Sequence, residues 1–243
     1  MGGKKLRSKL RLSIKYLFIT FVLISVYGTS QTNAQKVKET FQTKNYQLTI
    51  DEINSMNSSE IHFDSILYLK AYSQIKLNQL KEANISISQL LQLNSNYYEA
   101  YFLKGLLAAK KEKYPDAISN FNKVIDANPN HDKALYNMAL AKGLLEDYSN
   151  AIKDLDKCIA VNPNYSMAFY NRAYWYELSE NFTAAISDYK KAIEIDHHYK
   201  EAYIALAYAY SQNGDRVNAC ETLQVAKTEG VEAANDLIET FCK

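Results

Sequence analysis

The sequence predicts an all-α protein, an α-solenoid in which antiparallel helix pairs stack one after another and a short helix covers the last pair. The chain of 243 residues contains only three Pro and seven Gly, too few turn formers for a sandwich or barrel with many strands. Small residues recur with a 34-residue period, and large apolar residues recur with the same period. Periods of about 20 to 50 residues are typical of stacked repeat architectures.

Charge is distributed unevenly along the chain. The whole chain has 28 Lys and Arg residues against 27 Asp and Glu residues, but from Gln35 onward 22 basic residues face 27 acidic ones, a net charge of −5. Because phosphate binding needs a basic surface, we expect no binding of nucleic acid. The charged residues of the first 34 positions are all basic: Lys4, Lys5, Arg7, Lys9, Arg11 and Lys15.

Residues 1–34 have the pattern of a signal peptide. The basic residues precede an uncharged stretch of about 12 residues, Tyr16 to Tyr27, which has the length of a secretory hydrophobic region. It is shorter than the roughly 20 apolar residues that span a bilayer. Small residues lie where signal peptidase cuts, so we expect cleavage after Ala34 and a periplasmic or secreted protein. The alternative is an uncleaved leader that anchors the protein in the membrane.

Residues 64–233 divide into five 34-residue windows, which begin at residues 64, 98, 132, 166 and 200. Two antiparallel helices approach closely only where neither has a bulky side chain at the crossing. The eighth and twentieth residues of every window are small, so we interpret them as the crossing points. They are Ala71, Gly105, Ala139, Ala173 and Ala207 at position eight, and Ala83, Ala117, Ala151, Ala185 and Ala219 at position twenty.

Large apolar residues recur at positions four and twenty-four and are expected to fill the space around the small pair. Pro129 and Pro163, one full period apart, close two of the windows, because proline stops one helix and can start the next. Position four holds Leu67, Tyr101, Leu135, Phe169 and Tyr203, and position twenty-four holds Ile87, Phe121, Leu155, Tyr189 and Leu223.

Taken together, these residues resemble the tetratricopeptide repeat family. The family pattern has an aromatic residue or Leu at position four, a small residue at eight, Ala at twenty, an aromatic residue at twenty-four and Pro at thirty-two. The windows within 98–199 match it well, 200–233 lacks the closing Pro, and 64–97 is degenerate. Upstream, residues 35–63 are expected to form a degenerate N-terminal repeat or a helical cap. Apolar residues of the segment 234–243 predict a C-terminal capping helix.

The resemblance implies a superhelix in which the first helices of the windows line a concave groove, with positions two, five, nine, twelve and thirteen facing the groove. Positions five and nine are mostly aromatic, and tyrosine combines a wide contact area with a hydroxyl group. The alternative is that some of the rings fill gaps between adjacent repeats. The implied groove residues are Tyr68, Phe102, Tyr136, Tyr170 and Ile204 at position five, and Tyr72, Leu106, Leu140, Tyr174 and Tyr208 at position nine.

The favoured function is therefore an exported, non-catalytic scaffold that binds a protein or peptide in this groove. One alternative is a membrane-tethered adaptor that keeps its leader. Another is a glycan-binding protein, which needs a cluster of acids, for which Glu99, Glu177 and Glu201 are the candidates. We expect no cofactor, because the chain has no glycine-rich phosphate loop, and no metal site, because the four His residues fall at repeat junctions.

The three cysteines differ in their expected roles. Cys158 occupies position twenty-seven, where the family has Ala, and is predicted to be a buried small residue. Cys220 and Cys242 either form a disulfide that pins the capping helix, as an oxidising compartment would allow, or remain free thiols. Trp175 stands at position ten, where the other windows hold smaller residues, so its indole must either widen the repeat junction or lean outward.

Overall fold

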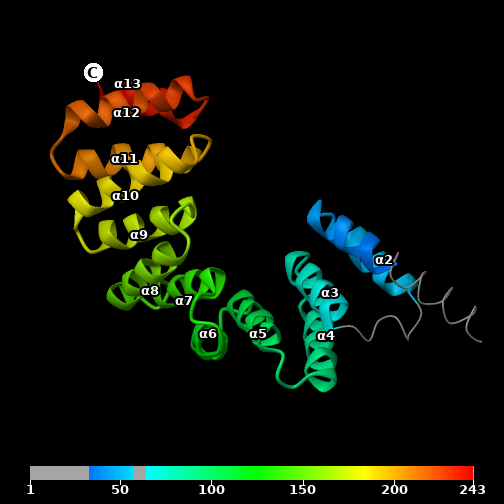
Figure 1. The fold of residues 1–243 in the computed structure, drawn as a ribbon. Helices are drawn as coiled ribbons and strands as arrows, with labels where there is room; N and C mark the ends of the chain where they lie inside the picture. Colours follow the sequence, from blue (N-terminus) through cyan, green and yellow to red (C-terminus); the bar gives the residue numbers. More distant parts are fainter. Residues whose placement is uncertain (1–32, 57–63, 243) are drawn as a thin grey trace, which may run out of the picture. The chain divides into compact units, whose positions relative to one another are not determined.

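The computed structural model describes residues 33–56 and 64–242 (Figure 1). These residues form helices joined by short turns, with no strand among them, so the predicted all-α class is confirmed. Of the expected signal peptide, all but Asn33 and Ala34 lies outside the described residues.

Residues 33–42 are helical, and the further helices follow at short intervals. They are α2 (Tyr46–Ser55), α3 (Asp64–Lys76), α4 (Leu80–Leu93), α5 (Tyr98–Lys110), α6 (Tyr114–Ala127), α7 (Asp132–Gly143), α8 (Tyr148–Val161), α9 (Ser166–Leu178), α10 (Phe182–Ile195), α11 (Lys200–Gln212), α12 (Arg216–Thr228) and α13 (Ala233–Phe241).

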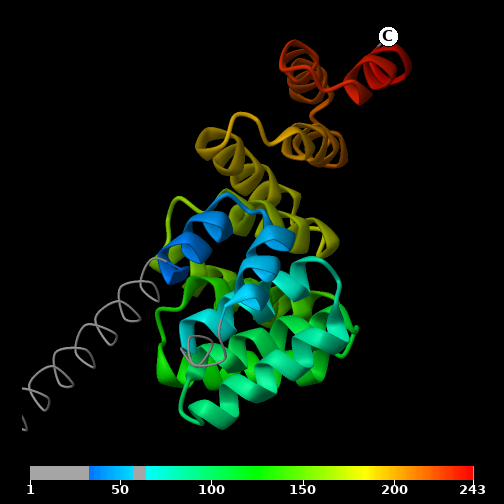
Figure 2. The same ribbon diagram turned by 90° about the vertical axis from the view of Figure 1, so that its right-hand side faces the viewer.

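The helices belong to two compact units, which divide between Leu103 and Lys104, inside α5. In the N-terminal unit α2 packs on α3, and α3 packs on α4. In the C-terminal unit each helix from α6 to α13 packs on the next one, and α9 also contacts α7 and α11. Figure 2 shows this succession for the C-terminal helices, drawn in orange and red. This is the stacking of an α-solenoid, as the sequence predicts.

Each 34-residue window contains one helix pair, and the same turn joins the two helices every time. The residue at position fifteen has a positive φ, between 57° and 80°, and the next N–H returns to a carbonyl five residues back, as Asp147 does to Lys142 at 3.0 Å. This hydrogen bond satisfies a carbonyl group that the helix end leaves free. The residues with positive φ are Asn78, Glu112, Glu146, Glu180 and Gly214.

The same turn recurs one period upstream, at Lys44, whose φ is 59°. There Asn45 accepts a hydrogen bond from the Leu48 N–H and so caps α2, as Asp147 caps α8 through the Asn150 N–H. A non-glycine residue with positive φ costs about 1 kcal/mol, so its recurrence in register indicates a constrained turn. The helix over 33–42 and α2 therefore form a sixth helix pair in phase with the other five.

The small residues lie at the helix crossings. All ten residues at positions eight and twenty are buried, as are all five large residues at position twenty-four. Gly105 shows the reason: a Cβ atom there would overlap the ring of Phe121. The side chain at position twenty-four thus packs directly onto position eight of the same helix pair. A larger residue at position eight would displace it.

Trp175 lies inside the stack, in a core cluster with Leu135, Leu155 and other buried residues. Its ring stacks on Tyr148, with ring centroids 5.6 Å apart. Space for the indole comes from Gly143, where a Cβ atom would overlap the Trp175 ring. Of the two possibilities for this residue, an outward-leaning indole is therefore wrong.

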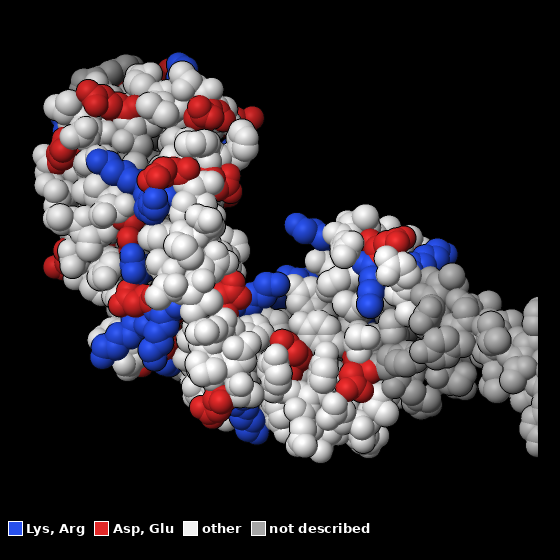
Figure 3. Space-filling view, viewed as in Figure 1, with Lys and Arg blue, Asp and Glu red and all other residues white. Residues whose placement is uncertain are grey.

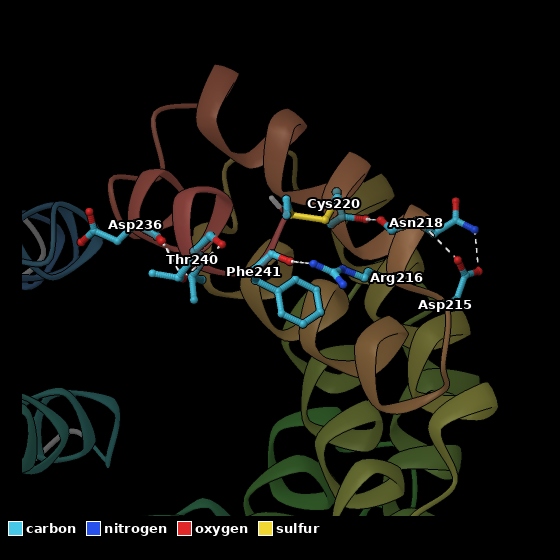
Figure 4. Close-up of a disulfide and its surroundings, with 10 residues drawn as sticks. Asp215, Arg216, Asn218, Cys220, Asp236, Thr240 and Phe241 are labelled. Atoms are coloured by element: carbon cyan, nitrogen blue, oxygen red, sulfur yellow. Dashed lines mark hydrogen bonds between the residues drawn. A yellow bond between two sulfur atoms is a disulfide. The ribbon is translucent and has the colours of Figure 1, made fainter.

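The C-terminal helix α13 covers the last pair. Ala234 is buried, and Ile238 and Phe241 pack against a core cluster that includes Tyr203 and Leu223. In the structure a disulfide joins Cys220 of α12 to Cys242, directly after α13 (Figure 4). This bond fixes the end of a helix only nine residues long, which would be marginal by itself.

Replacement of Gly143 by Ala is expected to lower the free energy of unfolding by about 1–3 kcal/mol, because the new methyl group overpacks against a rigid, buried ring. In a Trp175→Leu background the same replacement is expected to be neutral or stabilising, since Ala favours a helix more than Gly does. Urea unfolding of the four proteins checks this. An equal cost of Gly143→Ala in both backgrounds would contradict the close packing of this pair.

Candidate functional site

The ten groove residues implied by the sequence all lie on the first helices of the pairs, α3, α5, α7, α9 and α11, but positions five and nine differ in exposure. At position five, Phe102 and Tyr136 are buried, with 3% and 8% of their surface exposed. The others at that position, Tyr68, Tyr170 and Ile204, are half-buried. At position nine, Tyr72, Leu106 and Leu140 are half-buried, whereas Tyr174 and Tyr208 are 39% and 51% exposed.

The tyrosines at position five pack against the residue that precedes the next helix pair. Tyr136 lies against Tyr165, with ring centroids 4.9 Å apart, and Tyr170 lies against Tyr199 at 4.8 Å. Tyr68 and Tyr97 form the equivalent pair in the N-terminal unit, at 6.4 Å. Aromatic pairs at such distances stabilise packing beyond the burial of their area. These rings therefore join successive repeats, which is the alternative role that the sequence left open for them.

Burial changes the acid–base behaviour of the Tyr136 ring. Desolvation raises the pKa of its phenol to about 12, the neighbouring Cys158 contributes in the same direction, and the hydrogen bond from Asn171 opposes it. That bond runs from the Asn171 amide to the phenol oxygen at 3.1 Å. Burial likewise raises the pKa of the Cys158 thiol to about 12, and this cysteine is buried as predicted. Both groups stay protonated at neutral pH and act by packing.

An apolar cavity opens between α7 and α9. Its volume is about 240 Å³, and its lining residues are Leu140, Leu144, Tyr170, Asn171, Tyr174 and Trp175. We call it the α7–α9 cavity. Leu144, at position thirteen, is 58% exposed, which is unusual for a leucine that faces a cavity. A single exposed apolar residue needs no special explanation, but several that adjoin one another often form an interaction surface.

Positions two and thirteen, which the resemblance also implies for the groove, hold further exposed apolar residues. Leu144 and Leu178, at position thirteen, and Met167, at position two, are exposed. From the sequence, individual groove residues were predicted only at positions five and nine. Positions two and thirteen are apolar in some windows and polar in others, whereas a core position stays apolar throughout the repeats.

Ion pairs fix the helix that supplies most of the cavity. Arg172 of α9 binds both carboxylate oxygens of Asp188 on α10, through Nε at 2.6 Å and Nη2 at 2.8 Å. Its Nη1 donates to Asp156 of α8 at 2.7 Å. Because one guanidinium group bridges two neighbouring helices with bidentate geometry on one of them, α9 is held firmly with Tyr170 and Tyr174 in place.

The acidic residues near the cavity are few. Burial raises the pKa of Tyr170, and the charges of Glu201 and then Glu177 act in the same direction, so their carboxylates lie close to that ring. Burial raises the pKa of Glu177, and the hydroxyl of Tyr189 donates a hydrogen bond to it at 3.0 Å. Glu99, the third candidate for a glycan site, lies in the N-terminal unit. Within residues 33–56 and 64–242, no three His, Cys, Asp or Glu side chains gather as a metal site would require.

The family is decided by comparison with known repeats. Tetratricopeptide repeats match residues 68–132, 132–165 and 168–198. The chain belongs to the tetratricopeptide repeat family. The matches end before α11, yet the pair α11–α12 continues the same architecture to residue 228. No curated protein matches the sequence.

Solved structures share the fold of this tetratricopeptide repeat chain. MamA is 22% identical, with a TM-score of 0.61, and the alignment covers 68% of this chain and 96% of MamA. YrrB, described as a TPR protein with an unusual peptide-binding site, is 21% identical, with a TM-score of 0.58 and coverages of 70% and 88%. A chain of the APC/C hetero-tetramer Cut9–Hcn1 is 12% identical, with a TM-score of 0.76 and coverages of 88% and 43%. At such identities the likeness concerns the fold alone.

The raised pKa of Tyr136 predicts a loss of stability at alkaline pH. The folded state holds the phenol proton up to about pH 12, whereas the unfolded chain releases it near pH 10. The contribution to stability is therefore complete below pH 10 and is lost as the pH rises from 10 towards 12, by roughly 1 kcal/mol per pH unit. Urea unfolding at pH 9, 10 and 11 measures this loss. Tyr136→Phe is expected to lose less, and equal losses in the two proteins would show that the phenol titrates normally.

Proposed function

We propose that the protein is an exported, non-catalytic scaffold that binds a segment of another protein along the first helices of its C-terminal unit. The observation that carries the proposal is the α7–α9 cavity, because apolar side chains line it and yet remain partly exposed. Ligand cavities in proteins are mostly apolar, with a few polar groups that orient the ligand. Asn171 is such a group here, since its side chain lines the cavity among apolar neighbours.

The difference in exposure between the aromatic residues at positions five and nine supports the same function. Rings at position five pack between repeats, whereas four apolar side chains of the C-terminal unit are exposed and can contact a partner: Tyr174 and Tyr208 at position nine, and Leu144 and Leu178 at position thirteen. Tyrosine at an interface gives a large contact area at a small cost in side-chain entropy. The likeness to YrrB, described as having a peptide-binding site, is consistent with a peptide as the partner segment, although that likeness concerns only the fold.

A pull-down with the purified protein tests this surface. The variant Leu144→Ser/Tyr174→Ala is expected to lose proteins that the unchanged chain recovers from its cells of origin, because both side chains are exposed and contribute to the same cavity. Val217→Ser/Val225→Ser on α12 is the matched control, since both valines are exposed and lie outside the cavity. If all three forms recover every protein equally, the α7–α9 cavity is excluded as the binding surface.

Export is the second part of the proposal and rests on the basic, then apolar, leader. The disulfide between Cys220 and Cys242 supports it, because such bonds persist in oxidising compartments and are rare in the cytosol. Each helix that the structure describes is too short or too polar to cross a membrane.

One observation favours the membrane-tethered alternative. Ala34, the residue at the expected cleavage site, lies within a helix and packs against a core cluster with Val37, Ile53 and Ile66. Cutting after Ala34 would remove this alanine from the cluster, whereas a retained leader would keep it.

The intact mass of the protein purified under non-reducing conditions distinguishes these cases. We expect a chain that begins at Gln35 and lacks two hydrogen atoms, which corresponds to cleavage together with one disulfide. A chain that retains residues 1–34 in the membrane fraction would establish the tethered adaptor instead. Free thiols at both Cys220 and Cys242 would contradict the disulfide, whichever N-terminus is found.

A further inference from the structure

A second cavity lies under the capping helix. Its volume is about 410 Å³, which lies within the range of about 300–1,000 Å³ that is common for ligand sites. Helices α11, α12 and α13 all contribute to it, and its walls are mainly apolar. We call it the cap cavity. The lining residues that matter for the argument are Ile204, Tyr208, Leu223, Leu237, Thr240 and Phe241.

The cap cavity uses the same repeat positions as the α7–α9 cavity. Ile204 and Tyr208 occupy positions five and nine of α11, as Tyr170 and Tyr174 do in α9. Helix α13 begins at Ala233, close to the point where the period places the next first helix. The truncated helix α13 therefore replaces a first helix as the second wall, and both cavities lie along the first helices of one unit.

Contacts from the N-terminal part of α12 hold the C-terminal end of the α13 wall in place (Figure 4). Besides the disulfide, Arg216 Nη2 donates a hydrogen bond to the Phe241 carbonyl oxygen at 2.6 Å. The Arg216 guanidinium also lies over the Phe241 ring, 5.3 Å from its centroid. The outer rim stays open, because Tyr208 is 51% exposed and Leu237 is 36% exposed.

The helices that form this apolar cavity carry a net negative charge. Residues 200–242 contain three basic residues and seven acidic ones, a net charge of −4. Glu201 lies three and seven residues before Ile204 and Tyr208 and so shares their helix face, and Asp236 lies four residues before Thr240 on α13. Figure 3 shows Asp and Glu side chains, in red, over this end of the unit at the top, with fewer Lys and Arg side chains.

We propose that the cap cavity binds one large apolar side chain, such as Leu or Phe, from a partner segment in which basic residues flank that side chain. The apolar walls take the side chain, and the carboxylates of Glu201 and Asp236 attract the basic flanks, which raises the association rate and selects the partner. The proposal rests on the proposed function in that the partner is a protein segment bound along the first helices. It adds a second site and the chemistry of its ligand.

Fluorescence anisotropy with two labelled peptides tests the proposal on the protein as the cells produce it. One peptide carries a single Phe between pairs of Lys, and the other has Glu in place of every Lys. The Lys peptide is expected to bind at least tenfold more tightly, and this preference should shrink in 0.5 M salt, which screens exposed charges. Replacing Phe by Ser is expected to abolish binding of the Lys peptide. Equal affinities for the Lys and Glu peptides, or no binding of the Lys peptide, would overturn the proposal.

Variants assign the binding to the cap cavity. Tyr208→Ala/Leu237→Ser is expected to lower the affinity for the Lys peptide at least fivefold. Cys220→Ser/Cys242→Ser is also expected to lower this affinity, because the α13 wall loosens. Glu201→Gln/Asp236→Asn removes only exposed charge and leaves the walls intact, so it should reduce the preference for Lys over Glu without loss of helicity. The exposed control Val217→Ser/Val225→Ser should bind as the unchanged protein does.

The same titration separates this inference from the proposed function. Leu144→Ser/Tyr174→Ala alters the α7–α9 cavity alone and should leave the affinity for the Lys peptide unchanged. If Leu144→Ser/Tyr174→Ala no longer binds the Lys peptide while Tyr208→Ala/Leu237→Ser still binds it, the cap cavity is excluded as the peptide site and the α7–α9 cavity is the site instead. If only the cap variants lose the peptide while the pull-down shows no effect of Leu144→Ser/Tyr174→Ala, the cap cavity stands and the α7–α9 surface is excluded.

Discussion

The close approach of two helices at one small residue is the constraint on which this protein depends. In the α5–α6 pair the backbone at position eight comes so near to the side chain at position twenty-four that the Phe121 ring leaves no space for a Cβ atom at Gly105, and the other four pairs have Ala at position eight. Repeating this contact once in every window makes every pair alike, and alike pairs stack with their first helices aligned. The cavities exist because that alignment brings equivalent positions of neighbouring first helices side by side.

The aromatic residues show how one stack supplies both cohesion and a binding surface. A ring at position five is covered by the tyrosine that precedes the next pair, as Tyr170 is by Tyr199, and its burial strengthens the repeat junction. One helical turn further on, Tyr174 and Tyr208 at position nine stay open to solvent. In these two repeats the rings that hold the junction and the rings that face solvent are different residues, which suits a family that keeps its fold while it changes partners.

The first and the last helix pair that the structure describes are completed by different means. At the C-terminus α13 is too short to be stable alone, and a disulfide and Arg216 fasten it to α12. At the N-terminus the helix over residues 33–42 and α2 form a pair whose turn residue, Lys44, repeats the conformation of the later turns. Because a terminal repeat buries its face against one neighbour only, α13 supplies the missing cover for the last pair, and it also creates a cavity wall.

The sequence by itself determined the helices, their pairing and the positions at the crossings, because each depends on local periodicity and on residue size within one repeat. It also indicated that α13 caps the last pair. Exposure of the individual rings was decided only by the tertiary structure, since the residue that covers Tyr136 lies in the next repeat junction, at Tyr165. The fit of Trp175 over Gly143 and the two cavities were likewise decided by packing between repeats, where shape and solvent access depend on side chains that no single repeat contains.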